Sequence, residues 1–93
     1  MVKVLLERDI KGEHVGEMIR LLRNLRVMAM QQLGYISGET LHAVDDPNHY
    51  LVISNWESLE DWENWLHNPE RKKLQDKLDS YMQAPTKIRI FTY

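Results

Sequence analysis

The sequence predicts an α+β fold of the ferredoxin-like class, with the order β-α-β-β-α-β and the helices on one face of an antiparallel sheet. Extended patterns lie at both ends of the chain and as a pair in its middle, and helical periodicities separate them. The chain has 93 residues, 43% of them apolar, which suffices for one modest hydrophobic core and excludes two. We therefore expect residues 1–93 to form a single domain.

The N-terminal part predicts a strand followed by a long helix. Residues 2–8 place valine and leucine between charged residues, a composition that favours a strand. Apolar residues then recur at helical spacing over residues 15–33, so this segment is expected to be a helix. Gly34 follows it directly and is expected to close the helix in the left-handed conformation.

A β-hairpin is expected in the middle of the chain. Extended patterns over residues 35–44 and 50–56 flank Asp45-Asp46-Pro47-Asn48, whose residue types favour a tight turn. If these residues alone form the loop, the register pairs Val44 with His49, Ala43 with Tyr50 and His42 with Leu51.

The second helical region is predicted to be split in two. Ser58 is a favourable N-cap for a short helix over residues 59–66. Asn68-Pro69 then starts another helix, which Pro85 ends. Residues 87–93 alternate in polarity and predict the last strand.

Both faces of the expected hairpin are apolar in this register. One face carries Ile36, Val44, Leu51 and Ile53, and the other carries Tyr35, Leu41, Ala43, Tyr50, Val52 and Trp56. Helices can cover only one face, and an exposed apolar patch of this kind usually marks an interface. We therefore expect a homodimer whose two sheets pack face to face.

Composition excludes several classes of function. The 12 Lys and Arg residues against 14 Asp and Glu residues give a net charge of −2, so neither nucleic-acid binding nor a polybasic membrane anchor is expected. The absence of cysteine excludes a thiol nucleophile and iron–sulfur ligation. The longest apolar run, Val27 to Met30, is too short for a bilayer, and the charged N-terminal segment is unlike a signal peptide. We expect a cytoplasmic protein.

Trp56, Trp62 and Trp65 are the candidate substrate-binding residues, together with Met18. Indole rings are rigid and suit the wall of a pocket for a flat aromatic molecule. Methionine offers an adaptable side chain to such a wall. Core packing accounts for the same residues without any ligand, so both interpretations stay open.

His42, His49 and Asn55 are the candidates for moving a proton. An unperturbed histidine titrates near neutrality and can act as a general base. Two histidines are too few to hold a metal ion, and no strand carboxylate is expected beside them, so no metal site is predicted. The alternative is that the histidines lie on the surface near the hairpin and that Asn55 satisfies backbone groups.

A family resemblance rests on the segment from Tyr50 to Glu70. A strand ends in Trp56-Glu57-Ser58, a short helix follows, and Asn68-Pro69 starts the next helix. This pattern, with Gly34-Tyr35 after the first long helix, resembles the antibiotic biosynthesis monooxygenase superfamily. The resemblance implies a dimeric α+β barrel that oxidises a small aromatic or quinol-type substrate with oxygen, without a cofactor.

The resemblance also implies roles for the candidate residues. Trp65 and Trp62 would stack against the substrate ring, and His42, His49 or Asn55 would move the proton.

Two alternatives to the cofactor-independent oxygenase stay open, and haem degradation is the first of them. Trp65 matches the pattern of haem-degrading members, although Gln75 stands where those members have the haem-ligating histidine. The third possibility is a non-catalytic homodimer that binds a small ligand.

Overall fold

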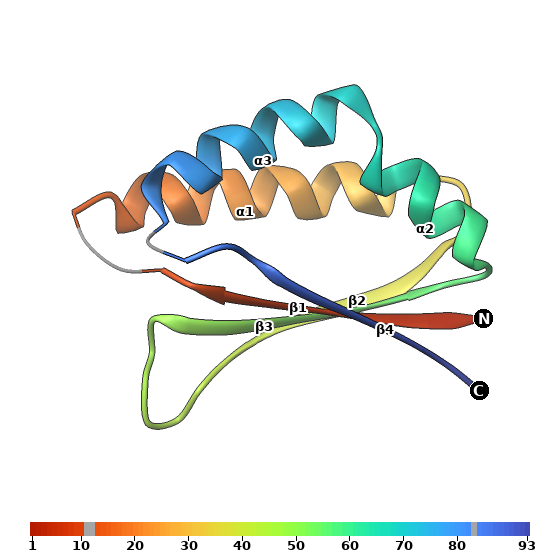
Figure 1. Ribbon diagram of the computed structural model, residues 1–93, viewed down its shortest axis with the longest axis horizontal. Helices are drawn as coiled ribbons and strands as arrows, with labels where there is room; N and C mark the ends of the chain where they lie inside the picture. The colour runs from red at the N-terminus through yellow and green to blue at the C-terminus, as the bar shows by residue number, and fades with distance from the viewer. Residues whose placement is uncertain (11–12, 83) are drawn as a thin grey trace.

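Four strands and three helices form two layers in the computed structural model, which describes residues 1–10, 13–82 and 84–93 (Figure 1). The elements in chain order are β1 (Val2–Asp9), α1 (Val15–Met30), β2 (Tyr35–His42), β3 (His49–Trp56), α2 (Leu59–Leu66), α3 (Pro69–Tyr81) and β4 (Lys87–Thr92). This is the predicted ferredoxin-like order with the second helical region split in two. None of the helices in the described ranges is long and apolar enough to cross a membrane.

The sheet is antiparallel throughout and has the strand order β2-β3-β1-β4. Strand β1 is central and pairs with β3 and β4, so the first and last strands of the chain are neighbours. All three helices lie on the same side of the sheet (Figure 1). The antiparallel sheet and the one-sided helical layer confirm the predicted fold class.

Local capping chemistry sets the ends of the helices. Gly34 has a φ of 86°, the left-handed conformation expected after the first helix, although α1 itself ends earlier, at Met30. The Ser58 side chain accepts a hydrogen bond from the Asp61 backbone N–H and caps α2. Asn68 caps α3 in the same way, with Pro69 in its first turn.

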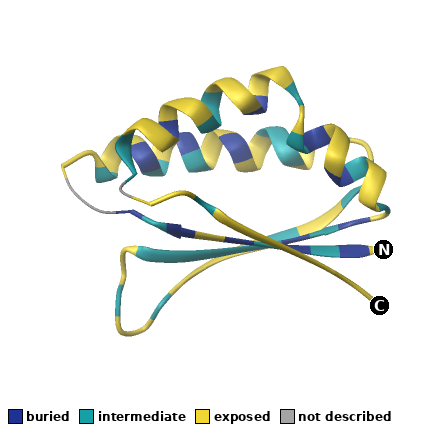
Figure 2. Cartoon of the chain, in the orientation of Figure 1, coloured by how far each residue is buried: buried dark blue, intermediate teal, exposed yellow. Residues whose placement is uncertain are grey.

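Alternation along β1 separates the buried face of the sheet from the outer one. Val2, Val4, Leu6 and Arg8 are buried beneath the helices, and the residues between them are more exposed (Figure 2). The pairing of β1 with β3 places four more side chains on this helical face: Tyr50, Val52, Ser54 and Trp56. The core therefore lies between the sheet and α1, α2 and α3.

The predicted hairpin register is wrong by one residue. His42 lies opposite Tyr50 and Leu41 opposite Leu51, and the Ala43 N–H donates to the His49 carbonyl at 2.9 Å. Residues 44–48 therefore form the loop, which includes Val44 as well as the four turn residues. Because the side-chain period of a strand is two, this shift moves Leu41 to the outer face.

Candidate functional site

An apolar cavity lies between the sheet and the helices. Its walls come from β1, β2, β3 and all three helices, and its volume is about 70 Å³. Its apolar lining includes four aromatic side chains and several aliphatic ones, among them Trp56, Trp62, Trp65, Tyr35, Leu22 and Leu25. Ligand sites in proteins have this character, with an apolar wall and a few polar groups.

The tryptophans form an ordered aromatic wall. Trp56 and Trp62 are 0% and 1% exposed, and their ring centroids lie 5.8 Å apart in an edge-on arrangement. Tyr35 packs edge-on against Trp56 at 5.4 Å. The Trp56 Nε1–H donates to the Ser54 hydroxyl at 3.0 Å. Trp62 and Trp65 lie three residues apart on α2, which begins after its N-cap Ser58, and both are on the buried side of that helix.

Two buried arginines also line the cavity. Arg8 is 4% exposed and Arg71 is 5% exposed. The Arg8 Nη2 donates to Gln75 Oε1 at 2.9 Å. The Arg71 guanidinium carbon lies 5.7 Å from the Trp62 ring centroid and 5.9 Å from that of Trp65, within the range of cation–π attraction.

Burial makes the charge of these arginines costly. Burial, reinforced by the positive charge of Arg71, lowers the pKa of Arg8 to about 10, and Asp79 offsets part of this effect. Burial also lowers the pKa of Arg71. Both side chains nevertheless remain protonated at neutral pH.

Asp79 raises the pKa of both arginines through its charge, but it forms no ion pair with either among the described residues. All 14 acidic residues lie in the described ranges, and within those ranges neither Arg8 nor Arg71 forms an ion pair. Two buried donors at the cavity, Arg8 Nε and Trp62 Nε1, have no hydrogen-bond partner there. An unsatisfied buried donor costs about 1–3 kcal/mol, so an acceptor at either donor would be stabilising.

Sequence reasoning missed both arginines. One signal was present, because Arg8 follows Val2, Val4 and Leu6 at the spacing of the apolar face of a strand. Arg71 had no such signal, because it follows Asn68-Pro69 among charged residues that favour a solvated helix face.

Comparison with known proteins decides the family. The model of the antibiotic biosynthesis monooxygenase family matches residues 1–77. The chain belongs to the antibiotic biosynthesis monooxygenase family. The resemblance drawn from Trp56-Glu57-Ser58 and Asn68-Pro69 is thereby confirmed.

Other known proteins are similar to this chain in sequence or in fold. Protein SchA of Streptomyces halstedii is 23% identical over 88 residues, which cover 95% of this chain and 23% of SchA. The chain thus spans about a quarter of the length of that curated relative. SnoaB of Streptomyces nogalater, a cofactor-independent oxygenase, has a similar structure, with a TM-score of 0.86 at 17% identity, covering 99% of this chain and 91% of SnoaB. A conserved protein from Methanosarcina mazei Go1 gives a TM-score of 0.89 at 18% identity, covering 97% and 89%.

In this monooxygenase-family chain, the cavity brings together three of the predicted substrate-binding residues. Trp56, Trp62 and Trp65 all line it. Met18 is fully buried in the core and is not among the cavity residues. Whether the tryptophans bind substrate stays a prediction.

The three predicted proton-handling residues lie away from the cavity. His49 and Asn55 lie on the outer face of the sheet, opposite Asp9 and Lys3 of β1. Asn55 donates to the Ser37 hydroxyl at 3.1 Å. His42 is exposed at the end of β2, with its ring 5.9 Å from that of Tyr50. None of the three is among the residues that line the cavity.

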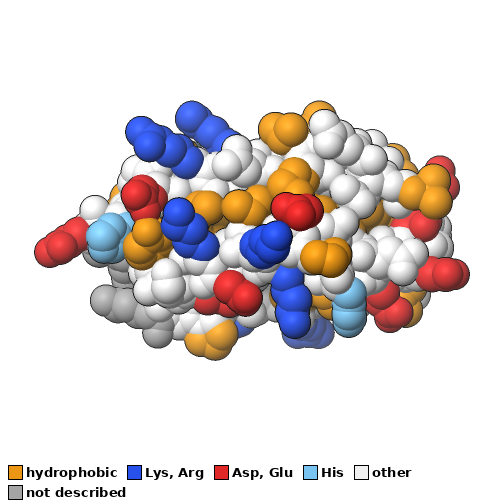
Figure 3. Space-filling model, turned by 90° about the horizontal axis from the view of Figure 1, so that it is seen from above, with side chains coloured by type: hydrophobic (Ala, Val, Ile, Leu, Met, Phe, Trp, Pro, Cys, Tyr) orange, Lys and Arg blue, Asp and Glu red, His pale blue; other side chains and the backbone are white. Residues whose placement is uncertain are grey.

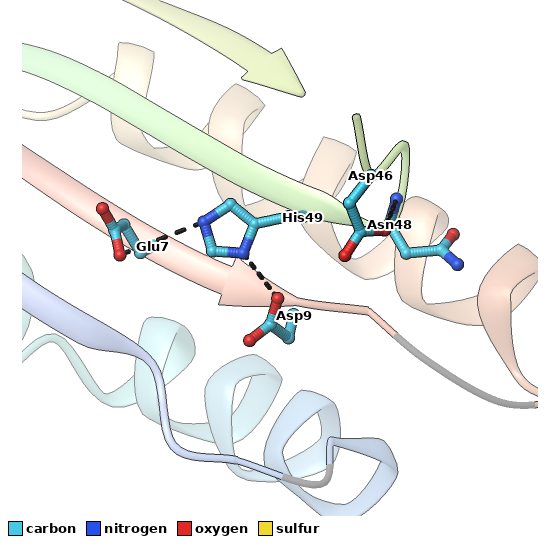
Figure 4. Close-up of polar contacts among 5 residues, drawn as sticks. All are labelled: Glu7, Asp9, Asp46, Asn48 and His49. Atoms are coloured by element: carbon cyan, nitrogen blue, oxygen red, sulfur yellow. Dashed lines mark hydrogen bonds and ion pairs between the residues drawn. The ribbon is translucent and has the colours of Figure 1, made fainter. Parts of the chain in front are cut away.

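Carboxylates accompany His49, contrary to expectation. Its Nδ1 lies 2.5 Å from Asp9 Oδ1, and its Nε2 lies 4.0 Å from Glu7 Oε2 (Figure 4). The hydrogen bond to Asp9 is the main cause of a raised pKa for His49, and the charge of Glu7 adds to it. The register of β1 against β3 creates this contact. No group of three or more acidic and histidine side chains in the described residues is able to hold a metal ion.

The His49 cluster gives a pH prediction. Because the folded-state pKa of His49 is raised, its stabilisation is complete at low pH and is lost as the pH rises through that pKa. We expect Asp9→Asn to lower the pKa of His49 toward the ordinary histidine value, measured by an NMR titration of the imidazole. Asp46→Asn is the matched control, because Asp46 acts through charge alone and should give a smaller decrease. Equal decreases in the two variants would contradict the assigned role of the hydrogen bond.

Proposed function

We propose that this protein is a cofactor-independent monooxygenase that oxidises a small aromatic, quinol-type substrate. The cavity with its tryptophan wall, in a chain of this family, is the observation that carries the proposal. SnoaB, which shares the fold, is a cofactor-independent oxygenase and supports the same class of reaction.

The proposed chemistry depends on an electron-rich anion of the substrate. After loss of a proton, the substrate itself supplies electrons to oxygen. One oxygen atom ends as a new ring carbonyl and the other leaves as water with two substrate hydrogens. A water-poor cavity strengthens every electrostatic interaction with that anion. The charges of Arg8 and Arg71 would stabilise it there.

Oxygen consumption by the metal-stripped protein, measured against a panel of hydroquinones and anthrones, tests this function. We expect uptake above the autoxidation rate of each substrate. Trp65→Ala should lower the rate about tenfold, because a lost aromatic stacking contact is worth about 1.5 kcal/mol. Val27→Ala, an exposed change on α1, should leave it unaltered. No uptake with any substrate would contradict the proposal.

The same assay tests the proton-handling residues. Alanine variants of His42, His49 and Asn55 show where the reaction takes place. They should leave oxygen uptake unaltered if it takes place in the cavity, and lower it if it takes place at the outer face or the hairpin.

A haem titration tests the haem-binding alternative. Both polar atoms of the Gln75 amide are already bonded, to Arg8 and to Asp79, and so we expect no Soret band.

We also propose that the chain forms a homodimer through the outer face of its sheet. Five apolar side chains lie on this face and are at least partly exposed: Leu5, Leu41, Leu51, Ile53 and Phe91. The helical side shown in Figure 3, by contrast, mixes apolar side chains with charges of both signs. Light scattering on a size-exclusion column should give twice the 11.1 kDa chain mass. A monomer at micromolar concentration would contradict this arrangement.

A further inference from the structure

Two buried positive charges face one apolar cavity, and no carboxylate in the described residues forms an ion pair with either, although Glu39 also lines the cavity. Arg8 and Arg71 are each about 95% buried and both line the cavity. A buried charge is normally paired, because removing it from water is costly. Within the described residues, which include every acid of the chain, no carboxylate forms an ion pair with either guanidinium.

The neighbouring groups offset this charge only in part. Arg8 and Arg71 are close enough for each other's charge to matter, since Arg71 disfavours protonation of Arg8. The charge of Asp79 on α3 raises the pKa of both arginines, and Gln75 links it to Arg8 by donating to Asp79 at 2.8 Å and accepting from Arg8. The hydrogen bond from Arg71 Nη1 to the Leu66 carbonyl is long, at 3.5 Å. An additional anion would therefore be stabilised at this end of the cavity.

Two donors at the cavity also lack acceptors. Arg8 Nε and Trp62 Nε1 are buried and have no hydrogen-bond partner among the residues that the structure describes. A carboxylate offers two oxygens with about four lone-pair sites, enough to accept from more than one donor. Next to these donors, the rings of Trp56, Trp62 and Trp65 provide flat apolar surfaces.

We infer that the cavity binds a planar aromatic carboxylate, with its anionic group at Arg8, Arg71 and Trp62 and its ring against the tryptophan wall. The inference rests on the proposed function in taking this cavity as the substrate site, and it adds the class of substrate. A carboxylate carries its charge at neutral pH, whereas a quinol must first lose a proton. An inorganic anion would satisfy the charge but would leave the aromatic wall unfilled.

Isothermal titration calorimetry with 2-naphthoate tests the inference, and 2-naphthamide is the uncharged control of the same shape. We expect 2-naphthoate to bind at least about tenfold more tightly than the amide, because the amide lacks the charge that strengthens a hydrogen bond to arginine, and one such bond accounts for a tenfold difference in affinity. Arg8→Met and Arg71→Met should each abolish that preference. Arg23→Met makes the same change on the exposed face of α1 and should retain it.

Thermal melts show whether the variants fold. Arg8→Met should melt at the wild-type temperature or above, because it removes an uncompensated buried charge. If it does not fold, Arg71→Met and the comparison of naphthoate with naphthamide on the wild-type protein still decide the question. Equal affinity for acid and amide would overturn the inference. Binding of inorganic phosphate as tight as that of naphthoate would also overturn it, because the site would then select only charge.

The outcomes separate this inference from the proposed function. Naphthoate binding that depends on the arginines, without oxygen uptake from any substrate, would support the inference and contradict the oxygenase. Oxygen uptake from neutral quinols without a preference for naphthoate would support the oxygenase and contradict the inference.

Discussion

Replacing Gly34 by alanine is expected to destabilise the protein by about 3 kcal/mol. Its φ of 86° costs a residue with a Cβ about 1–2 kcal/mol. The new Cβ would also overlap the side chain of Asp61. Asp61 accepts a hydrogen bond from the Ser58 hydroxyl and donates its own N–H to it, so moving Asp61 disturbs the cap of α2, worth about 1 kcal/mol.

Gly16→Ala is the matched control for this prediction. Gly16 lies in α1, and a Cβ added there meets nothing within 4 Å. Alanine is favoured over glycine in a helix by roughly 0.5–1 kcal/mol, so this variant should be more stable than the wild type. Urea denaturation monitored by circular dichroism measures both variants. If both changes shift the free energy of unfolding in the same direction, backbone conformation does not explain the effect of Gly34→Ala.

The features of the fold that the sequence predicts well are governed by neighbouring residues. Gly34 as a left-handed residue, Ser58 as the cap of α2 and Asn68-Pro69 as the start of α3 are all found in the structure. In each case a few adjacent residues determine the conformation.

The hairpin register was predicted wrongly, because it depends on the length of the loop and not only on the types of the turn residues. Residue types marked Asp45-Asp46-Pro47-Asn48 as a turn but did not show that Val44 also belongs to the loop. A further irregularity in the pairing of β2 with β3, between Tyr35 and Ser37, depends on contacts across the sheet. A single added residue exchanges the two faces of a strand, so the assignment of Leu41 was reversed.

The candidate site was likewise predictable only in part. Trp62 and Trp65 were predicted as pocket residues from the chemistry of their rings, and both lie on the buried side of α2 and line the cavity. The arginine pair depends instead on long-range assembly, since the contact of Arg8 with Gln75 joins residues 67 positions apart in the chain. Charged residues are rarely buried, so burial of two of them cannot be expected before the cavity that holds them is known.

Trp62 gives the second large effect, and the size of the effect depends on what replaces it. Trp62→Ala should cost about 3–5 kcal/mol, because the ring is 1% exposed and packs against Trp56 and beneath Arg71. Trp62→Phe should cost less than Trp62→Ala, because a smaller part of the buried ring is lost. Phenylalanine keeps an aromatic ring in place and removes an N–H that has no hydrogen-bond partner.

Trp56→Phe is the control that isolates the hydrogen bond. Trp56 is as buried as Trp62, but its Nε1–H donates to the Ser54 hydroxyl at 3.0 Å. The same substitution at this position breaks a bond and leaves a buried hydroxyl without its donor, so it should cost about 1–2 kcal/mol more than Trp62→Phe. Urea denaturation of the two variants measures this difference directly. Equal losses would mean that the Trp62 N–H already has a partner, and the argument that it awaits a ligand oxygen would fail.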